Sequence, residues 1–205
     1  LEDGSTISAE LVVGADGGNS VIRRQAGLLP LARDDQQEAL VTTVQIDRSM
    51  RQTAFQCFTA AGPLALLPVS EAHPDLASVV WSAEGGHIQH LLTLSDEKFC
   101  AAMSHCTADE AGVVLACDRR VTFPLRRQFT PRFVTRGIAL AGDAAHTIHP
   151  LGGQGVNLGF ADVAKLAELL TGASLSDQSI SDPALLREYA FARGPYNVAV
   201  AAAME

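Results

Sequence analysis

The chain has few of the residues that mark several common classes of protein. It contains one tryptophan, two tyrosines and only four cysteines in 205 residues, and the cysteines show neither a Cys-x-x-Cys pair nor another metal-ligand spacing. We therefore expect reduced, partly buried thiols, as in cytoplasmic proteins, rather than a disulfide framework or a metal site. His146 and His149 lack further ligands in suitable spacing, so His146 is expected to brace its loop.

Positive charge is also scarce, because the net charge is −8 and no basic cluster is present. This excludes nucleic acid as a partner and gives anionic membrane surfaces nothing to attract. Residues 53–70 carry no charge, but Gly62, Pro63 and Pro68 interrupt them, which predicts two strands around a turn rather than a transmembrane segment. Any membrane contact is then expected to be peripheral or through partners.

The most informative segment that is present reads GIALAGDAAHTIHPLGGQGVNLGFAD, at residues 137–162. Residues 138–141 are apolar between glycines, which predicts a strand buried on both faces. Gly142 allows a sharp turn or a close ligand approach, and Asp143 at the strand tip can accept hydrogen bonds from sugar hydroxyls. A Pro- and Gly-rich loop follows, with Pro150, Gly152, Gly153 and Gly155.

A helix is predicted from about residue 155, because apolar residues recur at steps of three and four and form one stripe, with Gly172 as a plausible stop. The stripe consists of Val156, Phe160, Val163, Ala167 and Leu170. Its N-terminus has unpaired N–H groups and about half a positive charge, so it would stabilise an anion docked there.

This segment resembles the second flavin-binding motif of the FAD-dependent aromatic monooxygenases, the p-hydroxybenzoate hydroxylase-like family. Its residues are most similar to those of the ubiquinone-biosynthesis hydroxylases, which usually have Ala where this chain has Gly152. The resemblance implies that Asp143 holds the ribityl chain of the flavin, that Pro150 and the glycines pack at its ring, and that Gly155, Val156 and Asn157 present N–H groups to it.

A second motif, AELVVGADGGNSVIRR, occupies residues 9–24. Residues 11–13 predict another buried strand, glycines after it predict a tight turn, and Ser20 is a suitable N-cap for a short helix. The segment resembles the Asp-Gly motif of the same family, which implies that Asp16, Gly17 and Arg23 lie near the cofactors. From the residues alone, Asp16 could instead be a capping residue in a strand-to-helix turn.

Between the motifs, short β-branched runs at 39–46, 54–58, 64–67, 77–81 and 121–125 predict a mostly antiparallel sheet, with a helix at 95–104. This part resembles the family's substrate domain, whose sheet floors a pocket. Residues 62–68 and 79–82 could supply its wall or be ordinary core, and Trp81 is taken as core. We expect an α/β fold, α+β overall: a partial Rossmann-like FAD-binding domain at 1–30 and 136–205, with a substrate-binding domain inserted at 31–135.

The resemblance implies a flavin-dependent hydroxylase that uses FAD, NAD(P)H and O₂ and acts through a C4a-hydroperoxyflavin. The expected substrate is a polyprenyl phenol or benzoquinol intermediate of ubiquinone biosynthesis, with a ubiquinone-biosynthesis complex as a partner and a location in the cytoplasm or at the periphery of the inner membrane. The cofactor-binding residues implied are Asp16, Gly17, Arg23, Gly142, Asp143, Pro150, Gly152, Gly153, Gly155, Val156 and Asn157. No catalytic residue is assigned; Pro150, His149 and Arg126 are candidates by type only.

The Gly-x-Gly-x-x-Gly fingerprint with which the family begins is absent, as is an initiator Met. We therefore expect a fragment that is inactive on its own and binds FAD poorly. Other readings stay open: a hydroxylase of a small soluble phenol, a flavin halogenase or prenyl reductase, or a non-catalytic scaffold that holds a quinone intermediate. The single tryptophan argues against the Trp-x-Trp-x-Ile-Pro signature of the halogenases.

Overall fold

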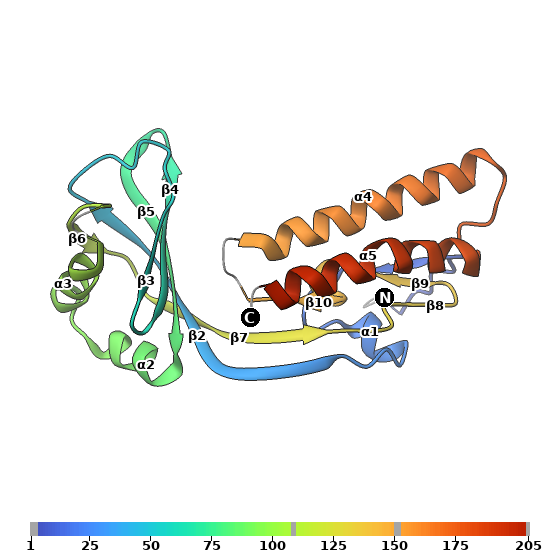
Figure 1. The fold of residues 1–205 in the computed structure, drawn as a ribbon, viewed down its shortest axis with the longest axis horizontal. Coiled ribbons are helices and arrows are strands. Elements are labelled where there is room, and N and C mark those ends of the chain that lie inside the picture. Colours follow the sequence, from blue (N-terminus) through green and yellow to red (C-terminus); the bar gives the residue numbers. More distant parts are fainter. Residues whose placement is uncertain (1–3, 108–109, 150–152, 204–205) are drawn as a thin grey trace. The chain divides into compact units, whose positions relative to one another are not determined.

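The computed structural model describes residues 4–107, 110–149 and 153–203. The chain divides into two compact units (Figure 1). Unit 1 comprises Leu1–Arg33 and Arg126–Glu205, and unit 2 comprises Asp34–Leu125. The sequence analysis placed the corresponding boundaries at residues 30 and 135.

Unit 1 is built on a small sheet with the strand order β1-β9-β8. These strands are β1 (Val12–Gly14), β8 (Val134–Thr135) and β9 (Ile138–Leu140). β1 and β9, the two predicted motif strands, are parallel neighbours, whereas β8 is antiparallel to β9. Burial was wrongly predicted for β1: the side chains of Val12 and Val13 are 41% and 40% exposed, because β1 lies at an edge of this sheet.

Helices pack beside this sheet. The described elements are α1 (Val21–Gln25), the 3₁₀ turn η1 (Gly142–Ala144), the short strand β10 (His146–Thr147), α4 (Gln154–Leu175) and α5 (Pro183–Ala203). α4 and α5 run side by side, and α5 contacts β8 (Figure 1). Their apolar faces and the strand β9 share one core, which includes Leu28, Phe133, Ala139, Leu140, Leu166, Leu185, Leu186 and Tyr189.

The apolar stripe identified in the sequence of α4 is not the face that the helix buries. Val156, Phe160 and Val163 are 60%, 68% and 50% exposed, and the helix continues past Gly172 to Leu175. The face that α4 buries instead carries Leu158, Asp162, Leu166 and Ala173. The apolar periodicity identified a helix correctly, but the stripe does not mark its inward face, because η1 and α5 pack against the other side.

Unit 2 is an antiparallel sheet covered by two helices, as predicted for its strands. Its elements are β2 (Leu31–Ile46), β3 (Phe55–Thr59), β4 (Gly62–Ser70), β5 (His73–Glu84), α2 (Gly85–Thr93), α3 (Asp96–Thr107), β6 (Val114–Cys117) and β7 (Val121–Phe129). The strand order of the sheet is β10-β7-β2-β5-β4-β3, in which β10 of unit 1 pairs with the end of β7 at Gln128 and Phe129, and β6 also pairs with β2. β2 and β7 carry the chain into and out of unit 2. The sequence analysis missed α2 and β6.

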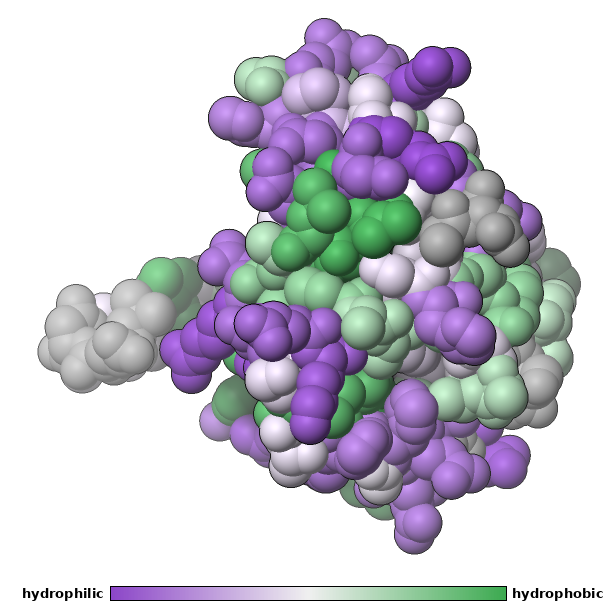
Figure 2. Space-filling model, turned by 90° about the vertical axis from the view of Figure 1, so that its left-hand side faces the viewer, coloured by the Kyte–Doolittle hydropathy of each residue, from purple (hydrophilic) through white to green (hydrophobic). Residues whose placement is uncertain are grey.

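The core of unit 2 lies between the sheet and the helices α2 and α3. Leu64, Leu66, Val79 and Trp81 are nearly fully buried there, and the Trp81 ring meets His87 of α2 edge-on at 5.5 Å between ring centroids. These side chains are therefore core, as expected for Trp81. Figure 2 shows the side of unit 2 that carries α2 and α3, where mostly hydrophilic residues surround a small hydrophobic patch.

Candidate cofactor-binding site

The two motifs meet because their strands pair. Gly14 stands opposite Leu140 in the parallel register of β1 and β9, and the Ala141 amide donates to the Gly14 carbonyl at 3.0 Å. Gly14 leaves room for this packing, since a Cβ atom there would lie 2.6 Å from Leu140 Cδ2 and the buried Leu140 side chain would have to shift. The turns that follow the two strands therefore lie at the same edge of the sheet, where ligands bind in open α/β folds.

Asp16 caps α1. Its carboxylate accepts hydrogen bonds from the Ser20 hydroxyl at 2.5 Å and from the Val21 and Ile22 amides at 2.7 and 3.2 Å. Ser20 is the N-cap, as predicted, and accepts from the Arg23 amide. Although desolvation acts to raise it, the pKa of Asp16 lies below its ordinary value because these donors favour the charged form. Asp16 is thus a capping residue in the strand-to-helix turn, and its role in cofactor binding stays a prediction. The same holds for the neighbouring Gly17, which adopts a positive φ of 79°.

Arg23 joins the first motif to the second. Its guanidinium is buried and donates to the Ala144 carbonyl at 2.8 Å and to the Gly18 carbonyl at 2.7 Å. Gln128 of β7 also donates to the Gly18 carbonyl, which ties β7 into the same cluster. Arg23 therefore fixes the turn after β1 against the turn after β9, and its direct contact with a cofactor remains untested.

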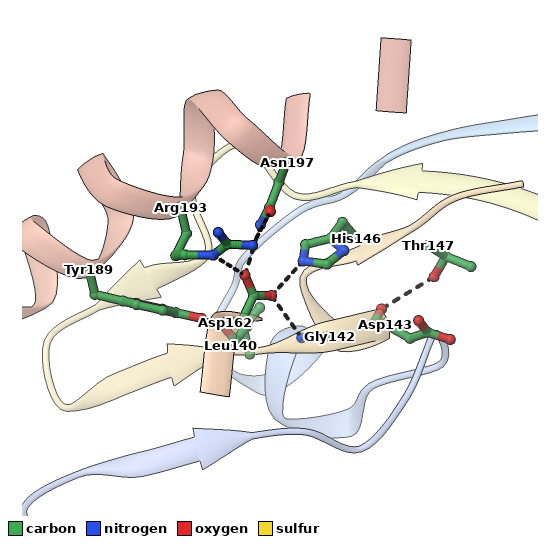
Figure 3. A network of polar contacts seen from close by, with 9 residues as sticks. All are labelled: Leu140, Gly142, Asp143, His146, Thr147, Asp162, Tyr189, Arg193 and Asn197. Carbon is green, nitrogen blue, oxygen red and sulfur yellow. Dashed lines mark hydrogen bonds and ion pairs between the residues drawn. The ribbon is translucent and has the colours of Figure 1, made fainter. Parts of the chain in front are cut away.

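Asp143 stands at the tip of β9, as predicted, in the turn η1. Gly142 before it has a φ of 59°, a left-handed conformation that favours glycine. The backbone carbonyl of Asp143 accepts from the Thr147 hydroxyl at 3.3 Å. Its side chain is exposed and points away from the buried network (Figure 3), and it makes no hydrogen bond with the described residues. The backbone of Asp143 is thus held in place, and its carboxylate is free to accept hydrogen bonds.

The centre of the buried network is Asp162, which the sequence analysis did not single out. This fully buried carboxylate lies on α4 and accepts four hydrogen bonds (Figure 3). Its Oδ2 accepts from His146 Nε2 at 2.5 Å and from the Gly142 amide at 3.1 Å, and its Oδ1 accepts from Arg193 Nε at 2.8 Å and from Asn197 Nδ2 at 3.0 Å. Burial acts to raise the pKa of Asp162, but these donors outweigh it and hold the pKa below its ordinary value.

Two further buried groups complete the network. His146 is 2% exposed and lies on β10, so it braces the segment after Asp143, consistent with its predicted bracing role. Tyr189 of α5 donates its hydroxyl to the Leu140 carbonyl at 2.9 Å, which fixes the end of β9. Both α4 and α5 are therefore bonded directly to the strand end and turn that present Asp143.

The N-terminus of α4 is the second polar feature. Gly153 is its N-cap with a φ of 65°, and among the described residues no side chain caps it. Gly155 is half-buried, and Val156 and Asn157 are exposed in the first turn. Pro150 and Gly152, both predicted site residues, lie outside the described residues.

The remaining candidates lie near a mostly apolar hollow in unit 1. Its lining includes Leu31, Gln128, Phe129, His146, Thr147 and Ile148. His149 follows directly and is half-buried, whereas Arg126 is exposed on β7. The contacts around His149 and Arg126 do not assign a catalytic role to either residue.

In the described part of the chain, no three His, Cys, Asp or Glu side chains gather as metal ligands. Within the same residues, none of the helices has the length and apolar character of a membrane span.

Known proteins resemble this chain over nearly its whole length. The ubiquinone hydroxylase UbiL of Rhodospirillum rubrum is 40% identical over 198 residues, which are 97% of this chain and 46% of that protein. The 3-demethoxyubiquinol 3-hydroxylase of Escherichia coli is 35% identical over 205 residues, 100% of this chain and 51% of that protein. The chain thus spans about half the length of these curated relatives.

A solved structure also resembles this chain in its fold. PqsL of Pseudomonas aeruginosa, a probable FAD-dependent monooxygenase, superposes with a TM-score of 0.83 at 25% identity, over 98% of this chain and 56% of that one. The predicted mixed α/β fold with a large antiparallel sheet is therefore confirmed. A family model described as the FAD binding domain matches residues 1–203, and the chain belongs to this FAD-binding family.

Proposed function

We propose that the protein to which this chain belongs is an FAD-dependent monooxygenase that hydroxylates an aromatic ring. The substrate we propose is a polyprenyl phenol or benzoquinol intermediate of ubiquinone biosynthesis, with NAD(P)H and O₂ as co-substrates. The hydroxylase names of the relatives from R. rubrum and E. coli support this substrate class. A location in the cytoplasm, at the periphery of a membrane or in a complex of ubiquinone-biosynthesis enzymes belongs to the same proposal.

The observation that carries the proposal is the exposed Asp143 carboxylate at the end of β9, in the turn η1 that packs against α4, together with the α4 N-terminus, which has no described side-chain cap. These groups fit FAD. A carboxylate accepts hydrogen bonds from the hydroxyls of a ribityl chain, and free N–H groups at a helix N-terminus stabilise an anionic ring edge. Gly142 and Gly153, both with positive φ, keep side-chain bulk away from the two places.

The residues of the chain then have separate tasks. Asp143 would hold the ribityl hydroxyls, and Gly155, Val156 and Asn157 would offer amides to the flavin ring, next to Pro150 and Gly152. Asp16 and Arg23 would shape the neighbouring turn through the contacts described above. When bound, FAD supplies the redox chemistry with NAD(P)H and O₂, and the protein orients it and excludes water.

Asp143→Ala tests the cofactor site. In the protein as its source cell makes it, we expect the dissociation constant for FAD to rise about 10- to 100-fold, because hydrogen bonds to a charged group contribute about 1.5–3 kcal/mol. Fluorescence titration of the flavin-free protein measures this. Glu188→Ala, which removes an exposed carboxylate from α5, is the matched control and should leave the affinity unchanged. Wild-type affinity in Asp143→Ala would contradict the assignment.

The substrate is tested in cells. Deleting the gene should lead to accumulation of a prenylated quinone precursor that lacks one ring hydroxyl, and mass spectrometry of lipid extracts identifies the missing position. Reintroduction of the wild-type gene is the control. An unchanged quinone pool, in a strain without a second such hydroxylase, would refute the ubiquinone substrate and favour a small soluble phenol.

A further inference from the structure

We propose that Asp162 is a positioning residue for the flavin site, which fixes the turn carrying Asp143 relative to the helix α4 whose N-terminus forms the other half of that site. The inference rests on the proposed function, because it concerns how the two cofactor contacts are held together. The sequence motif ends at Asp162, but none of the cofactor contacts proposed for that motif accounts for a fully buried carboxylate within the helix.

The backbone of α4 lies directly against the turn, which gives a short side chain its reach. A Cβ atom at Gly159 would lie 3.2 Å from the Cα of Gly142, so the two glycines allow an unusually close approach. Asp162 follows Gly159 by three residues and therefore lies on the same face of the helix. From there its carboxylate reaches the Gly142 amide without any intervening group.

The two oxygens of Asp162 have different partners. Oδ2 accepts from Gly142 and His146, which are on either side of Asp143 in the sequence, whereas Oδ1 accepts from Arg193 and Asn197 of α5 (Figure 3). One carboxylate thus links α4, α5 and the segment that presents Asp143. Such hydrogen-bonded supports set the geometry of the groups that contact a ligand.

The arrangement separates support from binding. The Asp162 carboxylate is completely buried and fully used by protein donors, and the Asp143 carboxylate is exposed with no hydrogen bond to the described residues. Because the supports lie immediately before Asp143 and three residues after it, its backbone has little freedom to move. Loss of the Oδ2 contacts should therefore displace Asp143 from its ligand rather than remove a ligand contact directly.

A double-mutant cycle tests this coupling in the protein as its source cell makes it. Asp162→Asn should raise the dissociation constant for FAD at least about 10-fold in the wild-type background, the size typical of lost outer-shell supports. In an Asp143→Asn background the same change should cost less than about threefold, because the group that it positions is already impaired. Glu168→Gln, which breaks an exposed pair with Lys165 on α4, is the control and should change neither value.

A second pair of variants isolates the Oδ2 side. His146→Leu removes one donor and should weaken FAD binding, whereas His146→Gln keeps an N–H group and should restore most of the affinity. This pair provides the same test if Asp162→Asn does not fold, because Asp162 then keeps its charge and its α5 partners. Thermal unfolding of the flavin-free variants gives their stability separately.

The outcomes distinguish the two proposals. If the wild-type protein does not bind FAD, the proposed function fails and this inference fails with it. If the wild type binds FAD and Asp143→Asn weakens binding, but the Asp162 and Asp143 effects are fully additive, only the positioning role is overturned. The same holds if the folded Asp162 and His146 variants lose thermal stability but keep wild-type FAD affinity.

Discussion

Arg193→Met should destabilise unit 1 through an uncompensated buried charge. Asp162 is fully buried, Arg193 is 9% exposed, and the Nε–Oδ1 distance is 2.8 Å. Breaking a buried ion pair by removing one partner typically costs about 3–5 kcal/mol. Three donors to Asp162 would remain, so we expect about 3 kcal/mol at neutral pH, at the lower end of that range.

The cost should depend on pH in a defined direction. The folded-state pKa of Asp162 lies below 3.8, so its stabilising contribution is present above the unfolded pKa and is lost as the pH falls through the folded one. In Arg193→Met the burial that raises this pKa persists while one group that lowers it is gone, so the pKa moves upward. The destabilisation should therefore be largest at pH 7.5 and become smaller on acidification, because Asp162 of the variant takes up a proton at a higher pH than in the wild type.

Hydrogen exchange measured by mass spectrometry assigns this loss to unit 1. Amides in α4, α5 and β9 should exchange faster in the variant, and peptides of unit 2 serve as an internal reference. Arg187→Met is the matched control, because this arginine is exposed on the same helix, and it should change stability by less than about 0.5 kcal/mol. A loss below about 1 kcal/mol at pH 7.5, or one that grows on acidification, would refute the argument.

Three further tests each probe a single site. Tyr189→Phe removes the buried bond to the Leu140 carbonyl and should cost unit 1 about 1–2 kcal/mol in urea unfolding followed by hydrogen exchange; no loss would contradict its role. Gly62→Ala places a Cβ atom on the Ser82 carbonyl and should cost unit 2 about 3 kcal/mol or more by fluorescence of the single tryptophan, whereas Gly86→Ala in open space should be neutral or stabilising. Burial and the Cys100 thiol raise the pKa of Cys117 from 9.0 to about 12, so its thiolate at pH 8 is about 1,000-fold scarcer and iodoacetamide should label it very slowly; rapid labelling would contradict this.

The features that the sequence predicted correctly depend on local signals. The apolar runs before Gly14 and Gly142 are strands, and Ser20 caps the helix after the first of them. Each depends on neighbouring residues within one turn or strand, so pattern and capping preference suffice to identify it. The position of Asp143 at a strand tip follows from the same local order.

The side of an element that faces its neighbours was harder to predict. α4 has apolar residues on more than one face, and its most regular stripe, which includes Phe160, is exposed. β4 and β5 are likewise apolar on both faces, so their sequences did not indicate which side α2 and α3 would cover. In each case the choice depends on partners distant in sequence, which periodicity within the element does not report.

Asp162 shows why the support of the site was beyond sequence reasoning. It stands 20 residues after Gly142 and 31 residues before Arg193, and only the packing of α4 against η1 and α5 brings these groups within 3.1 Å of one carboxylate. As one acidic residue in a helix, it has the sequence appearance of a solvated position. The usual helical signal, a charge pair at a separation of three or four residues, points to Lys165 instead, but Lys165 pairs with Glu168 and the cationic partner of Asp162 is Arg193 on another helix. A buried carboxylate is tolerated only where several donors converge, and that convergence follows from the fold, which makes a missing donor the most sensitive test of how this site is held.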